Sequence, residues 1–324
     1  MKIIIAILAS FVLALILGRF TVPALRALKA GQSIREIGPN WHRSKEGTPT
    51  MGGVIFILPM ILCILMSIPQ IVAGDLTLVY LLLFTLIFGA IGFLDDFVKV
   101  KFKRNLGLTA LQKFLLQLAA AGCFLVLLRF NGNLNGDLYI PFFNVTWHIN
   151  WIVYLIFAMF VIVGCVNAVN LTDGVDGLAT GVTMPVMMFF VVASVAAKND
   201  TLALFPAVLL GGLAGFLCYN FHPAKVFMGD TGSLFLGAAV SAMAFALDMP
   251  LILILVGIIY IIETLSVILQ TGYFKLTHGK RIFKMSPIHH HFEMCGWSEV
   301  KIFTVFTAVT VVACALAYLG ITNR

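Results

Sequence analysis

The chain is built from apolar runs of about 20 residues that recur from one end to the other. An α-helix of that length crosses a hydrocarbon core of roughly 30 Å. The runs lack the ten-residue alternation of a membrane β-barrel. Apolar residues make up 61% of the 324 residues and charged residues 11%, which excludes an ordinary soluble domain. The sequence therefore predicts an all-α integral membrane protein, with a single polytopic membrane domain over 1–324.

About ten transmembrane helices are expected. The first run lies where a signal peptide would, but it is long, Arg19 interrupts it, and no small-residue cleavage site follows, so we interpret it as a membrane helix. Between two of the runs, segment 130–147 has turn residues before an aromatic and β-branched stretch, which predicts a short exposed hairpin. The approximate spans are 3–24, 50–69, 76–97, 108–129, 148–168, 178–197, 201–220, 231–247, 250–272 and 301–321.

Basic residues indicate the orientation. Sixteen of the 21 lysines and arginines fall in the segments that follow the first, third, fifth, seventh and ninth predicted spans. By the positive-inside rule these segments are cytoplasmic, and both termini lie outside. The net charge of +7 is then a topological signal and a site for anionic ligands, so no nucleic-acid partner is expected.

Two adjacent aspartates, Asp95 and Asp96, end one predicted span at the cytoplasmic face. Lys99 follows four and three residues later and can approach either carboxylate on a helix. A solvated helix end with one ion pair is an adequate interpretation of these residues alone. However, acidic groups near a helix C-terminus oppose the macrodipole, which favours a compensating cation, either Lys99 or a hard metal ion.

A second polar motif, VNAVNLTDGVDGLATG, covers residues 166–181. Asn167, Asn170, Asp173 and Asp176 recur at every third residue, and the glycines among them allow a ligand close to the backbone. In a tight turn or the first turns of a helix, this spacing aligns amide and carboxylate oxygens. The alternative is a helix start rich in capping residues, which explains one such residue better than four.

Two further motifs lie on the same face. Asp230 precedes the span at 231–247 and is either a site carboxylate or an N-cap. His289, His290 and His291 are consecutive, so they cannot all face one metal ion, and an exposed loop is the alternative.

The segment 35–53 is a basic turn that contains glycine. It suits phosphate binding, although a positive-inside loop explains it equally well. Taken together, the cytoplasmic motifs offer carboxylates for a hard divalent cation and basic residues for phosphates. Oxygen ligands favour Mg²⁺, which commonly binds one or two carboxylates and substrate phosphates. The residues therefore predict a phosphoryl-transfer site at the cytoplasmic face, without the P-loop of an ATPase.

These motifs resemble those of a known family, the phospho-N-acetylmuramoyl-pentapeptide transferases, which are the bacterial MraY-type translocases. The wider superfamily of polyprenyl-phosphate N-acetylhexosamine-1-phosphate transferases shares the aspartate motifs, whereas the first and last motifs resemble the muramoyl-pentapeptide branch. The matching blocks, in chain order, are GTPTMGG (47–53), FLDDFVK (93–99), NAVNLTDGVDGLATG (167–181), FMGDTGS (227–233) and SPIHHHFE (286–293).

The resemblance implies ten transmembrane helices, a homodimer and a place in the bacterial cytoplasmic membrane. It implies transfer of phospho-MurNAc-pentapeptide from UDP to the membrane lipid undecaprenyl phosphate with Mg²⁺, giving lipid I and UMP in peptidoglycan synthesis. By matching position it implies that the catalytic residues are Asp95, Asp96, Asp230, His289 and His290, the three aspartates being metal-proximal. The implied substrate-binding residues are Lys45, Thr50, Lys99, Lys113, Asn170, Asp173, Asp176, Asn220, Phe227, Gln270 and His291.

Two mechanisms fit these residues, an aspartyl-phosphate intermediate and direct attack by the lipid phosphate. A phosphate monoester has a second pKa of about 6 and is mostly dianionic at neutral pH, so it needs little help from a base. We therefore expect direct attack, with Asp230 holding Mg²⁺ and Asp95 positioning or deprotonating the lipid phosphate. A UDP-GlcNAc:polyprenyl-phosphate GlcNAc-1-phosphate transferase is the nearest alternative function. A secondary transporter is the other, but its site would lie near the bilayer midplane.

Overall fold

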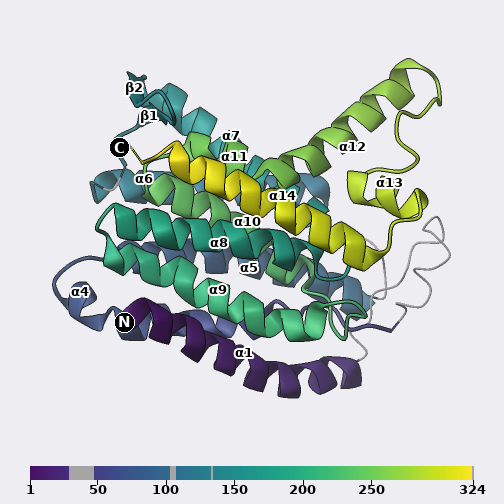
Figure 1. Cartoon of the computed structure of the whole chain (residues 1–324), viewed down its shortest axis with the longest axis horizontal. Coiled ribbons are helices and arrows are strands. Elements are labelled where there is room, and N and C mark those ends of the chain that lie inside the picture. Colours follow the sequence, from purple (N-terminus) through teal and green to yellow (C-terminus); the bar gives the residue numbers. More distant parts are fainter. Residues whose placement is uncertain (29–46, 103–106, 133, 323–324) are drawn as a thin grey trace.

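The computed structural model describes residues 1–28, 47–102, 107–132 and 134–322. Most of these residues are helical, and the long helices run side by side in one bundle (Figure 1). The elements in chain order are α1 (Lys2–Ala27), α2 (Val54–Ile57), η2 (Leu58–Met60), α3 (Ile61–Met66), α4 (Ile68–Val72), α5 (Thr77–Phe102), α6 (Ala110–Phe130), β1 (Asp137–Ile140), β2 (Val145–His148), α7 (Trp151–Thr172), α8 (Leu178–Ala196), α9 (Asp200–Asn220), α10 (Gly229–Ala246), η3 (Pro250–Ile252), α11 (Leu253–Val256), α12 (Ile258–Leu276), α13 (Ile288–Met294) and α14 (Glu299–Leu319).

The described helices support a multi-pass membrane protein. Seven of them, α1, α5, α6, α7, α8, α9 and α14, are long and apolar enough to cross a bilayer. The segments Pro250–Val256 and Ile258–Leu276 make an eighth if they are counted as one span. Helices are expected here because a chain in hydrocarbon must satisfy its backbone polar groups within each segment. The count of ten spans stays a prediction.

Two of the expected spans are not continuous helices. The span predicted over 50–69 is divided into the short helices α2, η2, α3 and α4. Pro59 and Pro69 contribute to this division, since proline has no N–H to donate within a helix. The span predicted over 250–272 bends by 81° at Gly257, so that α12 projects from the bundle (Figure 1).

Helix α10 lies at the centre of the bundle, where it packs against α5, α7 and α8. Every residue from Thr231 to Phe245 is buried. Glycines permit the close approach of its neighbours: a side chain at Gly92 of α5 would collide with the backbone carbonyl of Asp230. This contact brings the end of α5 directly against the start of α10.

The segment between α6 and α7 forms the expected hairpin. Strands β1 and β2 pair in antiparallel register, from Asp137 opposite His148 to Ile140 opposite Val145. The start of α1 and the end of α14 lie at one end of the bundle, and α13 lies at the other (Figure 1).

Candidate active site

Three carboxylates meet where α5 ends and α10 begins. Asp95 and Asp96 are buried on α5, and Asp230 is the second residue of α10. One oxygen atom from each of the three lies within 4.8 Å of the others. The structure therefore brings together the three residues that the sequence motifs suggested as a catalytic and metal-proximal set.

Two lysines neutralise part of this charge. The Nζ atom of Lys99 lies 2.6 Å from Asp95 Oδ2 and 3.0 Å from Asp230 Oδ2. Lys113, from α6, places its Nζ atom 2.7 Å from the same Asp230 oxygen. The other oxygen of Asp230 accepts a hydrogen bond of 2.8 Å from the Asn170 side chain. The expected ion pair of Lys99 with Asp95 is thus present, but the same ammonium group also bridges to Asp230.

Asp96 has a different environment. Its Oδ1 atom accepts a hydrogen bond from the backbone N–H of Asp230 at 3.2 Å. Its Oδ2 atom accepts from the backbone N–H and the hydroxyl of Thr231, at 2.9 Å and 2.7 Å. Met228, the residue before α10, provides no side-chain cap. Asp96 therefore caps α10 from a neighbouring helix, and the N-cap role considered for Asp230 is filled by another residue.

The cluster suits a hard divalent cation. Carboxylate oxygens are the ligands that Mg²⁺ prefers, and one or two commonly suffice when substrate phosphates complete the shell. Three carboxylates facing two ammonium groups leave an excess of one negative charge in the ionised state. All three carboxylates have partners, and Asp95 Oδ1 accepts a hydrogen bond from the Leu108 N–H at 2.8 Å. Asp95 Oδ2 and both oxygens of Asp230 contact the side chains of Lys99, Lys113 and Asn170, and the two lysines can turn toward a substrate phosphate. Asp95 and Asp230 are therefore better candidates to bind a cation than Asp96, whose oxygens bind the start of α10.

The motif 166–181 divides into separate contacts. Asn170 reaches Asp230, whereas Asn167 donates a hydrogen bond to Gln117 of α6 at 2.8 Å. Asp176, in the turn after α7, accepts a hydrogen bond from the Ala224 N–H, and its Oδ2 atom lies 2.9 Å from His222 Nδ1. The regular spacing therefore does not produce one row of ligands, because α7 ends at Thr172 and the chain turns.

The three histidines lie on α13 and have three different partners. The Nδ1 atom of His289 lies 3.0 Å from Glu263 Oε2, and that of His290 lies 2.6 Å from Glu293 Oε2. His291 Nδ1 accepts a hydrogen bond from the Lys284 N–H at 3.1 Å. The exposed-loop alternative is wrong, since the segment is helical and His289 is buried.

The remaining predicted residues lie around the cluster or brace the loops beside it. Thr50 is buried, and its hydroxyl lies close to the backbone of Gly229. A Cβ atom added to Gly229 would lie 2.6 Å from the Thr50 hydroxyl oxygen. Asn220 donates to the Val226 carbonyl at 3.0 Å. The Phe227 N–H donates to the Pro49 carbonyl at 2.8 Å.

Gln270 supports the chain that leads to α13. Its Oε1 atom accepts hydrogen bonds from the N–H groups of Ile282 and Phe283, each at 3.0 Å. The bracing role was not evident from sequence, because it depends on loop residues 12 and 13 positions away. Lys45 lies outside the described residues.

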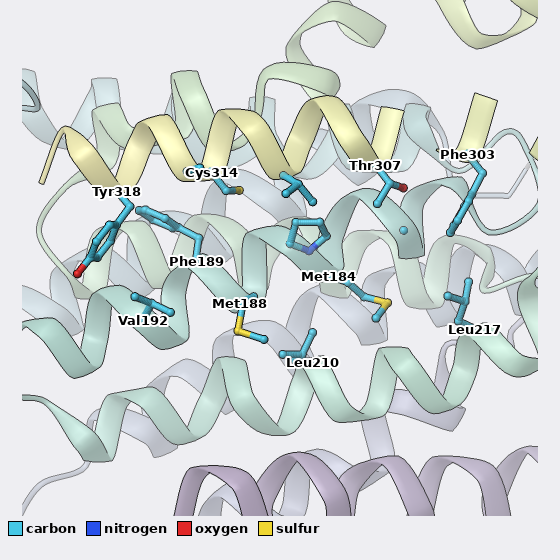
Figure 2. A pocket seen from close by; sticks show the side chains of 14 residues that line it. Met184, Met188, Phe189, Val192, Leu210, Leu217, Phe303, Thr307, Cys314 and Tyr318 are labelled. Atoms are coloured by element: carbon cyan, nitrogen blue, oxygen red, sulfur yellow. The ribbon is translucent and has the colours of Figure 1, made fainter. Parts of the chain in front are cut away.

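A cavity of about 540 Å³ lies between α8, α9 and α14 (Figure 2). Its lining is apolar and includes Met184, Met188 and Phe303. None of the described residues predicted for the site is among those that line it. The cavity can accept hydrocarbon, but it offers no carboxylate or lysine for phosphoryl transfer, so the candidate active site is the carboxylate cluster.

The fold is that of a helical membrane protein, and its site combines carboxylates with lysines where helices begin and end. These features are those of a membrane-embedded transferase. The comparisons agree with this class, because the model of glycosyl transferase family 4 matches residues 78–248. Signature 1 of phospho-N-acetylmuramoyl-pentapeptide-transferase matches residues 45–57.

Curated relatives give a narrower result. A phospho-N-acetylmuramoyl-pentapeptide-transferase of Clostridium acetobutylicum is 47% identical, over 98% of this chain and 99% of the relative. Proteins of the same name from Caldanaerobacter subterraneus subsp. tengcongensis and Clostridium perfringens strain 13 are each 50% identical to it. Each alignment covers 98% of this chain and 98% of the relative. The chain belongs to the phospho-N-acetylmuramoyl-pentapeptide-transferase family, as the resemblance of its motifs implied.

Proposed function

We propose that the cluster of Asp95, Asp96 and Asp230 is the catalytic centre for the reaction after which the family is named. The enzyme transfers phospho-MurNAc-pentapeptide from UDP-MurNAc-pentapeptide to undecaprenyl phosphate. The products are lipid I and UMP, and the reaction belongs to peptidoglycan synthesis. The observation that carries this assignment is the contact of one carboxylate, Asp230, with Lys99, Lys113 and Asn170.

The lysines are suited to bind the phosphates of both substrates. An ammonium group has three donors, so Lys99 and Lys113 can contact Asp230 and a phosphate oxygen at the same time. Phosphoryl transfer depends mainly on alignment and on neutralising the equatorial oxygens. These two residues therefore hold the diphosphate of the nucleotide and the phosphate of the lipid near each other.

Asp95 orients the attacking lipid phosphate, and Asp230 fixes the lysines that surround the diphosphate. The lipid phosphate oxygen attacks the phosphorus that carries the sugar, the bond from that phosphorus to the bridging oxygen breaks, and UMP leaves. Mg²⁺ held by Asp95 and Asp230 would neutralise charge that develops on the leaving phosphate. Asp96 keeps the start of α10 in register with α5 and so maintains the geometry of the other two carboxylates.

The proposal includes a topology. Ten crossings, both termini outside and a site facing the cytoplasm agree with the distribution of lysine and arginine. The start of α1 and the end of α14 lie at one end of the bundle and α13 lies at the other, which supports this orientation (Figure 1). The homodimer and the location in the bacterial cytoplasmic membrane follow from the resemblance and belong to the same proposal.

The test is release of labelled UMP in detergent, with and without added undecaprenyl phosphate. We expect release from UDP-MurNAc-pentapeptide that requires both the lipid and Mg²⁺. Release from UDP-GlcNAc in its place would identify the alternative transferase. Uptake of a solute by proteoliposomes, with no release of UMP in either arm, would identify a transporter. Labelled MurNAc-peptide retained covalently on the protein with the nucleotide alone would contradict direct attack.

A further inference from the structure

The hydroxyl of Ser233 makes a contact that the mechanism above does not use. Ser233 is fully buried on α10, one turn after Asp230. Its Oγ atom lies 2.7 Å from the side-chain nitrogen of Asn170, which belongs to the last turn of α7. The same nitrogen lies 2.8 Å from Asp230 Oδ1. One amide group of α7 therefore joins a carboxylate of the site to a serine of the central helix.

The number of hydrogens determines the direction of these bonds. A hydroxyl has one hydrogen, and that of Ser233 is donated to the Gly229 carbonyl at 3.0 Å. The Ser233 oxygen can then only accept from Asn170, and the Asp230 carboxylate can only accept as well. The amide nitrogen has two hydrogens, one for each acceptor. Both contacts therefore require the NH₂ group of Asn170 to face α10.

The Asp230 carboxylate is held differently at its two oxygens. Its Oδ2 atom contacts Lys99 at 3.0 Å and Lys113 at 2.7 Å. These ammonium groups end flexible side chains, and in the proposed reaction they also bind substrate phosphates. The Asn170 amide on Oδ1 has a second anchor at Ser233, in the most deeply packed helix of the bundle. The amide can therefore keep the carboxylate oriented when the lysines move.

We propose that Ser233 is a positioning residue that acts through Asn170. It anchors the Asn170 amide, and the amide in turn keeps the Asp230 carboxylate aligned while Lys99 and Lys113 bind substrate phosphates. This inference rests on the proposed function for the role of Asp230. The competing explanation is a hydrogen bond that only fastens α7 to α10.

The primary test is Ser233→Ala, which removes the hydroxyl from a helix position that suits alanine. We expect the kcat for UMP release to fall roughly tenfold, because a misaligned carboxylate weakens the transition state. The KM for UDP-MurNAc-pentapeptide should stay unchanged, since the buried hydroxyl itself contacts no substrate.

The matched control is Ser241→Ala on the same helix. Ser241 is also fully buried, and it also donates to the carbonyl four residues earlier, that of Gly237, at 3.0 Å. Among the described residues, its hydroxyl has no hydrogen-bond partner on another helix. Turnover of Ser233→Ala equal to that of Ser241→Ala would overturn the proposal.

A double-mutant cycle separates an effect through Asn170 from an effect on the packing of α10. If Ser233 acts through Asn170, then Ser233→Ala combined with Asn170→Ala is no slower than Asn170→Ala alone. Multiplicative losses in the double variant would overturn the proposal, because they would mean that the two side chains act independently.

Proton and nitrogen-15 NMR of labelled asparagine side chains gives a readout that does not depend on activity. The Asn170 signals are identified by their absence from Asn170→Asp. We expect both amide hydrogens of Asn170 to be shifted downfield by hydrogen bonding in the wild type and in Ser241→Ala, and one of them to move upfield in Ser233→Ala. Asn170 signals that Ser233→Ala leaves unchanged would overturn the inference even if UMP is released. Wild-type protein that shows the expected signals but releases no UMP would instead contradict the proposed function.

Discussion

Replacing Asp96 with asparagine tests the division of labour among the three carboxylates. The Asp96 carboxylate accepts three hydrogen bonds from the start of α10. Asparagine keeps the shape but has only one oxygen. In its better orientation the oxygen keeps both contacts to Thr231, and the NH₂ group faces the Asp230 N–H. The hydrogen bond from the Asp230 N–H is lost, and this N–H then faces the NH₂ group of the asparagine, so that two donors oppose each other.

The magnitude follows from these contacts. A hydrogen bond to a charged group contributes about 1.5–3 kcal/mol. Loss of a negative charge at a helix N-terminus removes roughly 0.3–1 kcal/mol more. We therefore expect Asp96→Asn to lower the free energy of unfolding by about 2–4 kcal/mol. Unfolding in mixed micelles of mild detergent and SDS, followed by circular dichroism, measures it.

Asp75→Asn is the matched control, since Asp75 is exposed and accepts a single hydrogen bond of 3.1 Å from the Thr77 N–H. Because Asp75 precedes α5, which begins at Thr77, the loss of its charge should lower the free energy of unfolding by at most about 0.3–1 kcal/mol, clearly less than at Asp96. The reasoning is refuted if Asp96→Asn abolishes UMP release with unchanged stability, because the carboxylate would then act on the substrate or a metal ion and not on α10.

Three further changes test the site and its scaffold. Asp230→Asn should remove most turnover and weaken its dependence on Mg²⁺; normal activity across a Mg²⁺ titration would exclude Asp230 as a ligand. His290→Ala should slow UMP release far more than Asp137→Asn in the β1–β2 hairpin, and equal rates would argue against a catalytic histidine. Gly92→Ala should force α5 away from α10, at a cost of about 1–3 kcal/mol in unfolding free energy, whereas Gly164→Ala meets open space and should leave stability intact. An unaffected Gly92→Ala protein would mean that the helices are not so closely packed.

The helical spans were predictable because a membrane imposes length and hydropathy directly on the sequence. The β1–β2 hairpin was predictable from its turn residues for the same local reason. The division of the second span and the bend at Gly257 were not. A proline or glycine permits a break, but whether the helix breaks depends on the neighbours that pack against it.

The site shows the same division between local and distant information. The ion pair of Asp95 with Lys99 follows from a spacing of four residues on one helix. The contact of Lys99 with Asp230 joins residues 131 positions apart, and no local pattern encodes it. The pairing of Glu263 with His289 was likewise not anticipated, although a glutamate in an apolar helix was a usable signal.

By itself, the sequence determined the class of protein, the composition of its membrane helices and, through its motifs, the family. Those properties depend on residue type and spacing along the chain. Only the tertiary structure decided that Asp96 caps α10, that two lysines share Asp230, and that a buried glutamate holds His289. These roles depend on which helix ends meet, and that is settled by close packing between segments far apart in the chain.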